Sequence, residues 1–249
     1  MLYFASKIKR YVMRIVPNWL KQTPIAHRGL WGGEIAENSI SAYKNAVKHG
    51  FAIEIDLYQT TDGELVSFHD ETLDRTTNGT GFIYEKSFSE LKNLTLKGTE
   101  NEKIPTFNEV LSIAEGKVPL LIELKNQPSK DFVENVIKRL KNYSGEFATQ
   151  SFNPKYIGKI KKLAPEFIRG ILGNHTAKEQ PLFKRFIIKR LPLNFAIKPD
   201  FISYNFTALP LKKRKVKNKV VLAWTITSPA SAEKIKPFCD NIIFEHFIP

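Results

Sequence analysis

The chain has 249 residues, of which 42% are hydrophobic, so it can form one large α/β domain or two small ones. Its 38 Lys and Arg residues against 25 Asp and Glu residues give a formal net charge of +13, which favours anionic partners. The single cysteine, Cys239, excludes an intramolecular disulfide, and no run reaches the roughly 18 apolar residues of a membrane span.

Residues 1–22 are predicted to form a basic amphipathic segment ahead of a domain at 23–249. At helical spacing, Phe4 and Ile8 share a face with Ile15, whereas Lys7 and Arg10 lie opposite. A signal peptide is disfavoured because basic residues and a proline interrupt the apolar region and no small-residue cleavage site follows. Such a segment can lie on an anionic membrane, and the alternative is an ordinary first helix that covers the bottom of the domain.

Short apolar runs alternate with helical patterns along the rest of the chain, which predicts a parallel sheet. The predicted strands are 24–26, 51–56, 65–68, 118–123, 147–151, 168–172, 201–203 and 220–224. Asn38 or Ser39 should cap a helix ending near Gly50, and Thr106 with Glu109 should form a capping box. About eight such units fit an α/β fold of the (β/α)8 TIM-barrel type, with its active site at the C-terminal strand ends. Residues 70–105 then form a small insertion after the third strand, and a doubly wound open sheet is the alternative.

Three carboxylates stand at the ends of predicted strands. Glu54 and Asp56 are two residues apart on one strand, so both side chains face the same side. If that side is the barrel interior, a divalent cation neutralises them best, and Glu123 can supply a third oxygen ligand. Ligation by oxygen alone favours Mg²⁺ or Ca²⁺. The alternative is a structural network in which these acids pair with Arg28 and Lys125.

Two histidines and two basic residues adjoin the same strand ends. His27 and His69 should reach one mouth of the barrel, where one imidazole can accept a proton from an attacking hydroxyl and the other can protonate a leaving alkoxide. Arg28 offers a planar fork for phosphate oxygens, and Lys125 can stabilise charge on the phosphoryl group. Trp224, at the end of the last predicted strand, either lines the substrate pocket or packs in the core. Together these residues predict a metal-assisted phosphodiesterase.

These residues stand within longer strings whose order and spacing are informative. The strings are Ala26-His27-Arg28-Gly29, Glu37-Asn38-Ser39, Glu54-Ile55-Asp56-Leu57, Thr61-Asp62-Gly63, residues 66–79, Ile104-Pro105-Thr106-Phe107, Ile122-Glu123-Leu124-Lys125 and Ala223-Trp224-Thr225. In this order they resemble the glycerophosphodiester phosphodiesterase family across most of residues 24–224.

The resemblance implies a TIM barrel with a small insertion after the third strand. It implies hydrolysis of a glycerophosphodiester to sn-glycerol 3-phosphate and an alcohol, with Ca²⁺ or Mg²⁺ as cofactor. The implied roles are acid–base catalysis by His27 and His69, metal binding by Glu54, Asp56 and Glu123, and phosphate binding by Arg28 and Lys125.

Three departures from the family pattern bear on the substrate. Ala36 stands where the family usually has proline, and residues 32–34 make the first loop unusual. Residues 241–245 stand where the family tends to carry Asp-Gly and then Thr-Asp. We expect the chemistry to survive these changes, whereas they leave the substrate preference open.

Basic residues gather at 184–190, among apolar neighbours, and at 212–219. Solvated charge is one reading, but an apolar–basic mixture also suits contact with an anionic bilayer, where each basic residue adds about 1 kcal/mol. The resulting hypothesis is a cytoplasmic enzyme, peripheral on the inner face of the membrane, that acts on glycerophosphodiesters or lysophospholipids.

Two other functions compete with this one. The first is a lysophospholipase D-like or cyclising phosphodiesterase that acts on lipids, in which the substrate's own hydroxyl attacks phosphorus; the same acid–base pair serves both routes. The second is a catalytically silent barrel that binds phosphate-bearing lipid or nucleic acid. A silent barrel would lack some of the histidines and carboxylates above, all of which are present, and no nucleic-acid-binding module is recognisable, so no nucleic-acid partner is expected.

Overall fold

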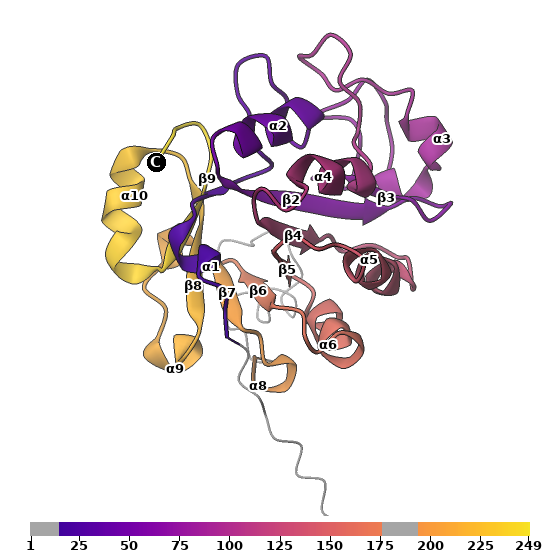
Figure 1. Ribbon diagram of the computed structural model, residues 1–249. Coiled ribbons are helices and arrows are strands. Elements are labelled where there is room, and N and C mark those ends of the chain that lie inside the picture. The colour runs from indigo at the N-terminus through magenta and orange to yellow at the C-terminus, as the bar shows by residue number, and fades with distance from the viewer. Residues whose placement is uncertain (1–14, 176–193) are drawn as a thin grey trace, which may run out of the picture.

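The computed structural model describes residues 15–175 and 194–249, and within them eight parallel strands close into a barrel (Figure 1). In order around the barrel the strands are β1 (Ile25–Ala26), β2 (Ala52–Gln59), β4 (Leu120–Leu124), β5 (Phe147–Ser151), β6 (Arg169–Gly173), β7 (Phe201–Asn205), β8 (Val220–Ile226) and β9 (Asn241–Phe244). Strand β9 pairs with β1, which in turn pairs with β2, so the sheet has no open edge within the barrel. The predicted TIM barrel is confirmed, and the open-sheet alternative is wrong.

Two of the strand assignments made from sequence need correction. The run at 65–68 is not a barrel strand, because β3 (Leu65–Ser67) runs antiparallel to β2 and lies outside the barrel. The eighth barrel strand is instead β9, in a segment that the sequence analysis treated only as a departure from the family pattern. A short apolar run carries no information about strand direction, and β9 has only three apolar residues, Ile242 to Phe244, to mark it.

Inward-facing positions of the barrel form two layers of opposite character. The lower layer is apolar and almost fully buried, and it contains Ile25, Ala52, Leu121, Ala148, Leu222 and Ile243. Because side chains alternate along a strand, the residue two positions later faces the same way. Those residues are His27, Glu54, Glu123, Gln150, Trp224 and Glu245. The upper layer, at the C-terminal mouth, is therefore mostly polar and rests on an apolar floor.

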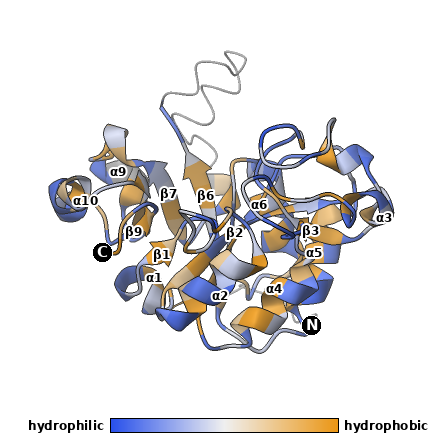
Figure 2. Cartoon of the chain, turned by 90° about the horizontal axis from the view of Figure 1, so that it is seen from above, coloured by the Kyte–Doolittle hydropathy of each residue, from blue (hydrophilic) through white to orange (hydrophobic). Residues whose placement is uncertain are grey.

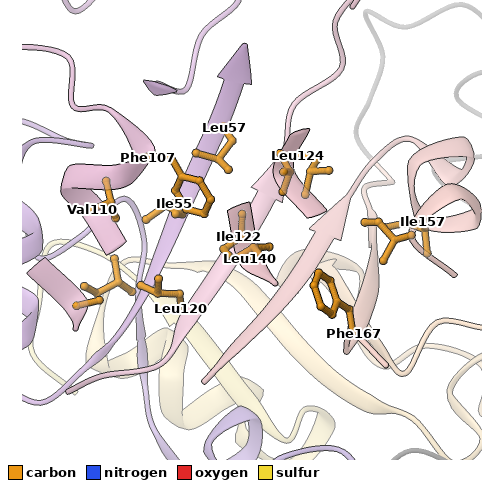
Figure 3. Close-up of a cluster of buried hydrophobic side chains, with 14 of the residues drawn as sticks. Ile55, Leu57, Phe107, Val110, Leu120, Ile122, Leu124, Leu140, Ile157 and Phe167 are labelled. Carbon is orange, nitrogen blue, oxygen red and sulfur yellow. The ribbon is translucent and has the colours of Figure 1, made fainter. Parts of the chain in front are cut away.

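Outward-facing strand residues pack against a ring of helices. The helices are α2 (Ile40–Lys48), α4 (Phe107–Ala114), α5 (Phe132–Leu140), α6 (Pro154–Leu163), α8 (Asn194–Ile197), α9 (Lys213–Val216) and α10 (Pro229–Ile235). Figure 3 shows Ile55 on β2 and Ile122 on β4 beside side chains from α4 and α5. The helices carry both hydrophobic and hydrophilic residues, as expected for elements that cover a core on one side (Figure 2).

Local capping agrees with the sequence patterns. Ser39, rather than Asn38, caps α2, because its hydroxyl accepts a hydrogen bond from the main-chain N–H of Ala42. Thr106 and Glu109 form the predicted capping box at the start of α4. None of the helices in the described ranges combines the length and the apolarity that a bilayer span requires.

The bottom of the barrel is covered by the short helix α1 (Trp19–Gln22). For these four residues the structure agrees with the alternative named above, an ordinary first helix that covers the bottom of the domain. Trp19 and Leu20 are buried in the apolar floor, and Asn241 on β9 donates a hydrogen bond to the carbonyl of Thr23. Residues 1–14 of the predicted amphipathic segment and the basic cluster at 184–190 lie outside the described residues.

The segment between β3 and α4 contains the short helices η1 (Ile83–Glu85) and α3 (Phe88–Leu91). Its apolar side chains, among them Leu73 and Leu96, form a small core of their own together with Tyr58 of β2. This core attaches the segment, which carries Asp70 and Arg75, to the rim of the barrel mouth.

The loop after β1 requires glycine at position 29. Gly29 has a φ of +82°, and a Cβ atom there would lie 2.8 Å from the carbonyl carbon and from the Cβ of Ala42. We expect Gly29→Ala to lower the free energy of unfolding by roughly 2–5 kcal/mol, from backbone strain and overpacking combined. Urea unfolding measures this loss. Gly158→Ala, in α6, is the matched control and should not destabilise the protein, because the nearest atom to the added methyl group would be Cγ2 of Ile197 at 3.9 Å, an ordinary van der Waals contact.

Candidate active site

Three carboxylates lie together at the C-terminal mouth of the barrel. Glu54 and Asp56 stand on β2, and Glu123 stands on the neighbouring strand β4, where the register pairs it with Asp56. All three are buried, and one oxygen from each lies within 4.8 Å of the others. The structure thus brings together the three acids that the sequence analysis selected as metal ligands.

Two basic residues selected from the sequence contact this carboxylate cluster. Lys125 Nζ lies 3.3 Å from Oδ1 of Asp56 and 3.1 Å from Oε1 of Glu123. Arg28 Nε lies 3.7 Å from Oδ2 of Asp56, and the Arg28 main-chain N–H donates to Glu54 at 3.1 Å. The ion pairs of the alternative network are therefore present. However, two basic side chains offset only two of the three carboxylates.

The excess of acidic over basic side chains in this cluster shifts the pKa values of its carboxyl groups. Burial and the nearby charges of Asp56 and Glu123 raise the pKa of Glu54 well above its usual range. Burial also raises the pKa of Glu123, although Lys125 opposes this. Asp56 is also buried, but Lys125 and its other positively charged neighbours hold its pKa below the usual range. One carboxylate in this cluster is therefore costly to ionise without a further positive charge.

The donor set fits a divalent cation. Oδ1 of Asp56 is buried and receives no hydrogen bond from any residue that the structure describes, although Lys125 lies nearby. A site built from three carboxylates offers only hard oxygen ligands, which suit Mg²⁺ or Ca²⁺. A divalent metal can thus be held by Glu54, Asp56 and Glu123, because their carboxylate oxygens lie close together.

His27 directly follows β1 and is oriented by a carboxylate at the end of β9, the strand beside β1 in the barrel. Its Nδ1 lies 2.7 Å from Oε2 of Glu245, which directly follows β9. Facing an ionised carboxylate, Nδ1 carries the proton, so Nε2 is the nitrogen that can exchange protons. Burial lowers the pKa of His27, and the hydrogen bond to Glu245 opposes that shift.

His69 reaches the same mouth by a different route. Strand β3 returns antiparallel along β2, and the Phe68 N–H donates to the carbonyl of Asp56 at 3.0 Å, which places His69 beside the carboxylate cluster. Its Nδ1 lies 2.6 Å from Oδ1 of Asp70, so here too Nε2 is available for proton exchange. Burial and the charge of Lys125 lower the pKa of His69.

Trp224 faces inward from β8, directly above the apolar floor. Its ring meets Phe152 edge-on, with centroids 5.7 Å apart, and it packs on the core residues below. Its buried Nε1 has no hydrogen-bond partner within residues 15–175 and 194–249. The residue therefore lies at the upper edge of the core, and its contact with the substrate stays a prediction.

Several residues of the site were not among those selected from the sequence. Glu245 lies two positions after the floor residue Ile243, so the same strand-end rule would have found it had β9 been recognised. Glu37, Asp70 and Arg75 stand inside the family strings but carried no assigned role, because their contacts join segments far apart in the chain. Asn38 likewise donates to Asp56 at 3.1 Å.

Comparison with known proteins agrees with this geometry. Residues 27–246 match the model of the glycerophosphoryl diester phosphodiesterase family. A glycerophosphodiester phosphodiesterase of Caldanaerobacter subterraneus is 34% identical over 90% of this chain and 94% of its own length. Glycerophosphodiester phosphodiesterase 1 of Bos taurus is 27% identical over 90% of this chain and 78% of its own length.

Among solved structures, a phosphodiesterase of Oleispira antarctica in complex with the product sn-glycerol-3-phosphate superposes with a TM-score of 0.74. It shares 25% identity and covers 90% of this chain and 92% of its own. The chain therefore belongs to the glycerophosphoryl diester phosphodiesterase family and is a phosphoric diester hydrolase.

Proposed function

We propose that this enzyme uses a divalent metal, Mg²⁺ or Ca²⁺, and the histidine pair to hydrolyse glycerophosphodiesters to sn-glycerol 3-phosphate and an alcohol. The observation that carries the proposal is the placement of two imidazoles beside one buried carboxylate cluster. Each imidazole has Nδ1 on a carboxylate and therefore presents Nε2 for proton transfer. The product bound in the Oleispira antarctica structure supports the same substrate class.

The two histidines divide the proton transfers of the reaction. One neutral imidazole accepts a proton at Nε2 from water as the water oxygen bonds to phosphorus. The other, as imidazolium, donates a proton to the alcohol oxygen as its bond to phosphorus breaks. Because burial lowers both pKa values, neither ring is locked in its charged form near neutral pH.

The basic residues of the site would hold the phosphate. Arg28 and Lys125 lie at the carboxylate cluster, and each would place its donors against non-bridging phosphoryl oxygens. When bound to Glu54, Asp56 and Glu123, a divalent cation would neutralise those acids and withdraw electron density from a phosphoryl oxygen. Trp224 would line the part of the pocket that accepts the alcohol group of the substrate.

A substrate panel tests the proposal and separates it from the cyclising route. Glycerophosphocholine, glycerophosphoethanolamine, glycerophosphoglycerol and lysophospholipids would be incubated with Ca²⁺, Mg²⁺ or EDTA, and the products identified by phosphorus NMR. Formation of sn-glycerol 3-phosphate supports the hydrolytic route. A cyclic phosphate would show that the substrate's own hydroxyl attacks, and no turnover of any glycerophosphodiester would overturn the proposal.

We also propose that the part of the predicted segment 1–22 that precedes α1 serves as a membrane-docking segment of a cytoplasmic enzyme, whereas α1 itself packs on the catalytic domain predicted at 23–249. The basic and apolar residues of this segment and the net charge of +13 support contact with an anionic inner membrane face. Such docking would bring the enzyme near lipid-derived diesters, including lysophospholipids.

Deletion of residues 1–14 should weaken binding to anionic vesicles. The deletion stops there because Trp19 and Leu20 are buried in the barrel floor, so a longer truncation would also destabilise the fold. Co-sedimentation with phosphatidylserine vesicles measures the effect, with vesicles of zwitterionic phosphatidylcholine, which has no net charge, as the control. Equal binding of the full chain and the truncated chain would show that this segment does not contribute to membrane docking.

A further inference from the structure

Arg75 lies at the rim of the mouth and uses two edges of its guanidinium group at once. Nη1 and Nη2 donate to the two carboxylate oxygens of Glu37 at 2.9 and 2.6 Å. Nε and Nη2 donate to the two oxygens of Asp70 at 2.5 and 3.0 Å. One arginine therefore forms two bidentate ion pairs, with carboxylates that lie on different loops.

Each of these carboxylates also holds a residue of the reaction site. Oε1 of Glu37 accepts from Nη1 of Arg28 at 2.8 Å, as well as from Arg75. Oδ1 of Asp70 meets Nδ1 of His69 at 2.6 Å, as well as Arg75. The five side chains form a continuous chain of contacts that runs Arg28, Glu37, Arg75, Asp70, His69.

We propose that Arg75 is a positioning residue that fixes the phosphate-binding Arg28 and the imidazole of His69 relative to each other. This inference rests on the proposed acid–base and phosphate-binding roles of those two residues. Arg28 follows β1, whereas His69 follows β3, so their own strands do not join them directly. Proton transfer at phosphorus needs both groups placed to within about 1 Å, since a misplacement of that size can cost 10²-fold in rate.

The geometry requires arginine and not only positive charge. A lysine ammonium is a point donor on a flexible stem and cannot form two parallel forks in one plane. The Arg75 side chain is also half exposed, at 50%, so its loss opens no cavity in the core. A large effect on catalysis with a small effect on stability would therefore distinguish positioning from a general role in folding.

The experiment compares Arg75→Met and Arg75→Lys with Arg139→Met. Arg139 is a partly buried arginine that hydrogen-bonds Asn108 on the outer helices, away from the site. Turnover of glycerophosphocholine with added Mg²⁺ or Ca²⁺, binding of inorganic phosphate by calorimetry, and the thermal midpoint would be measured for each variant. We expect Arg75→Met to lower kcat about 10- to 100-fold and to weaken phosphate binding. Arg75→Lys should not restore either property, and Arg139→Met should leave both unchanged.

The pH profile provides a readout that a purely structural role would not move. The charged groups that face His69 include Asp70, Asp56, Lys125 and Arg28, and also Glu37, the other partner of Arg75. Without Arg75, the whole charge of Asp70 acts on His69, and one nearby positive charge is gone. The limb of the kcat profile that belongs to His69 should therefore move to higher pH in Arg75→Met and stay in place in Arg139→Met.

A double variant separates failure of this inference from failure of the proposed function. In a His69→Ala background, Arg75→Met should cost less activity than in the wild-type enzyme, because one of the two positioned groups is absent. Equal losses in the two backgrounds, with an unmoved pH profile, would overturn the positioning role and leave the histidine mechanism intact. Wild-type activity in His69→Ala alone would instead overturn the proposed acid–base function.

Discussion

Replacing His27 or His69 by alanine should lower kcat for glycerophosphocholine by about 10²- to 10⁴-fold, with little change in KM. Each variant removes the Nε2 that accepts or donates the proton during P–O cleavage, whereas the phosphate-binding residues remain. Steady-state kinetics with saturating metal measure the effect. His49→Ala is the matched control, because His49 is exposed on the outside of the barrel, where its ring hydrogen-bonds the carbonyl of Asn45 and stacks with Phe51.

The partner of His27 allows a finer version of the same test. Glu245→Gln keeps a side chain of the same length but removes the charge whose hydrogen bond raises the pKa of His27. The pKa of His27 should then fall further below its ordinary value. The pH-profile limb that belongs to His27 should move to lower pH, whether that histidine acts as acid or as base. An unchanged profile, or full activity in His27→Ala, would contradict the role assigned to this residue.

Removing divalent cations with EDTA should lower kcat by at least about 10³-fold, because a metal of this kind supplies several kcal/mol of charge stabilisation. Adding excess Mg²⁺ or Ca²⁺ should restore activity, and the more effective ion identifies the preferred metal. The physical reason is the carboxylate cluster itself, where Lys125 and Arg28 offset only two of three buried acids. Asp56→Asn should remain inactive in the presence of either ion.

A binding readout makes this prediction independent of turnover. A ligand at about 100 times its dissociation constant stabilises the folded state by about 2.7 kcal/mol, so the metal should raise the thermal midpoint of the wild-type enzyme. Asp56→Asn should lose that increase, whereas Glu134→Gln, on the outer helix α5, should retain it. Full activity in EDTA, together with a midpoint that does not respond to metal, would show that the acids form only an ion-pair network.

His69 illustrates how a correct placement can follow from an incorrect strand assignment. The sequence predicted that its strand runs parallel within the barrel and delivers His69 to the mouth. In the structure, β2 extends to Gln59 beyond the mouth, and β3 brings the chain back antiparallel to it. Both paths end beside Asp56. Alternation of apolar residues specifies which side chains share a face, but it does not specify the direction of pairing.

Glu245 and Arg75 illustrate the opposite case, in which the local signal for a residue of the site is weak or absent. Glu245 follows a strand of four residues, and its partner His27 lies 218 positions earlier in the chain. Arg75 reads locally as an exposed charge in a loop, and only its position between Glu37 and Asp70 gives it a function. Contacts of this kind depend on how distant loops meet, which no local pattern records.

By itself, the sequence determined the (β/α)8 class, through the alternation of strand and helix patterns along the chain. It also determined the polar upper layer, because side chains alternate along a strand and therefore place Glu54, Asp56 and Glu123 on the same face as the apolar floor. The tertiary structure alone decided that β9 closes the barrel, that β3 lies outside it, and which carboxylate orients each imidazole. The reason is that strand periodicity is a local property of the chain, whereas barrel closure and the bridging ion pairs bring together residues far apart in it.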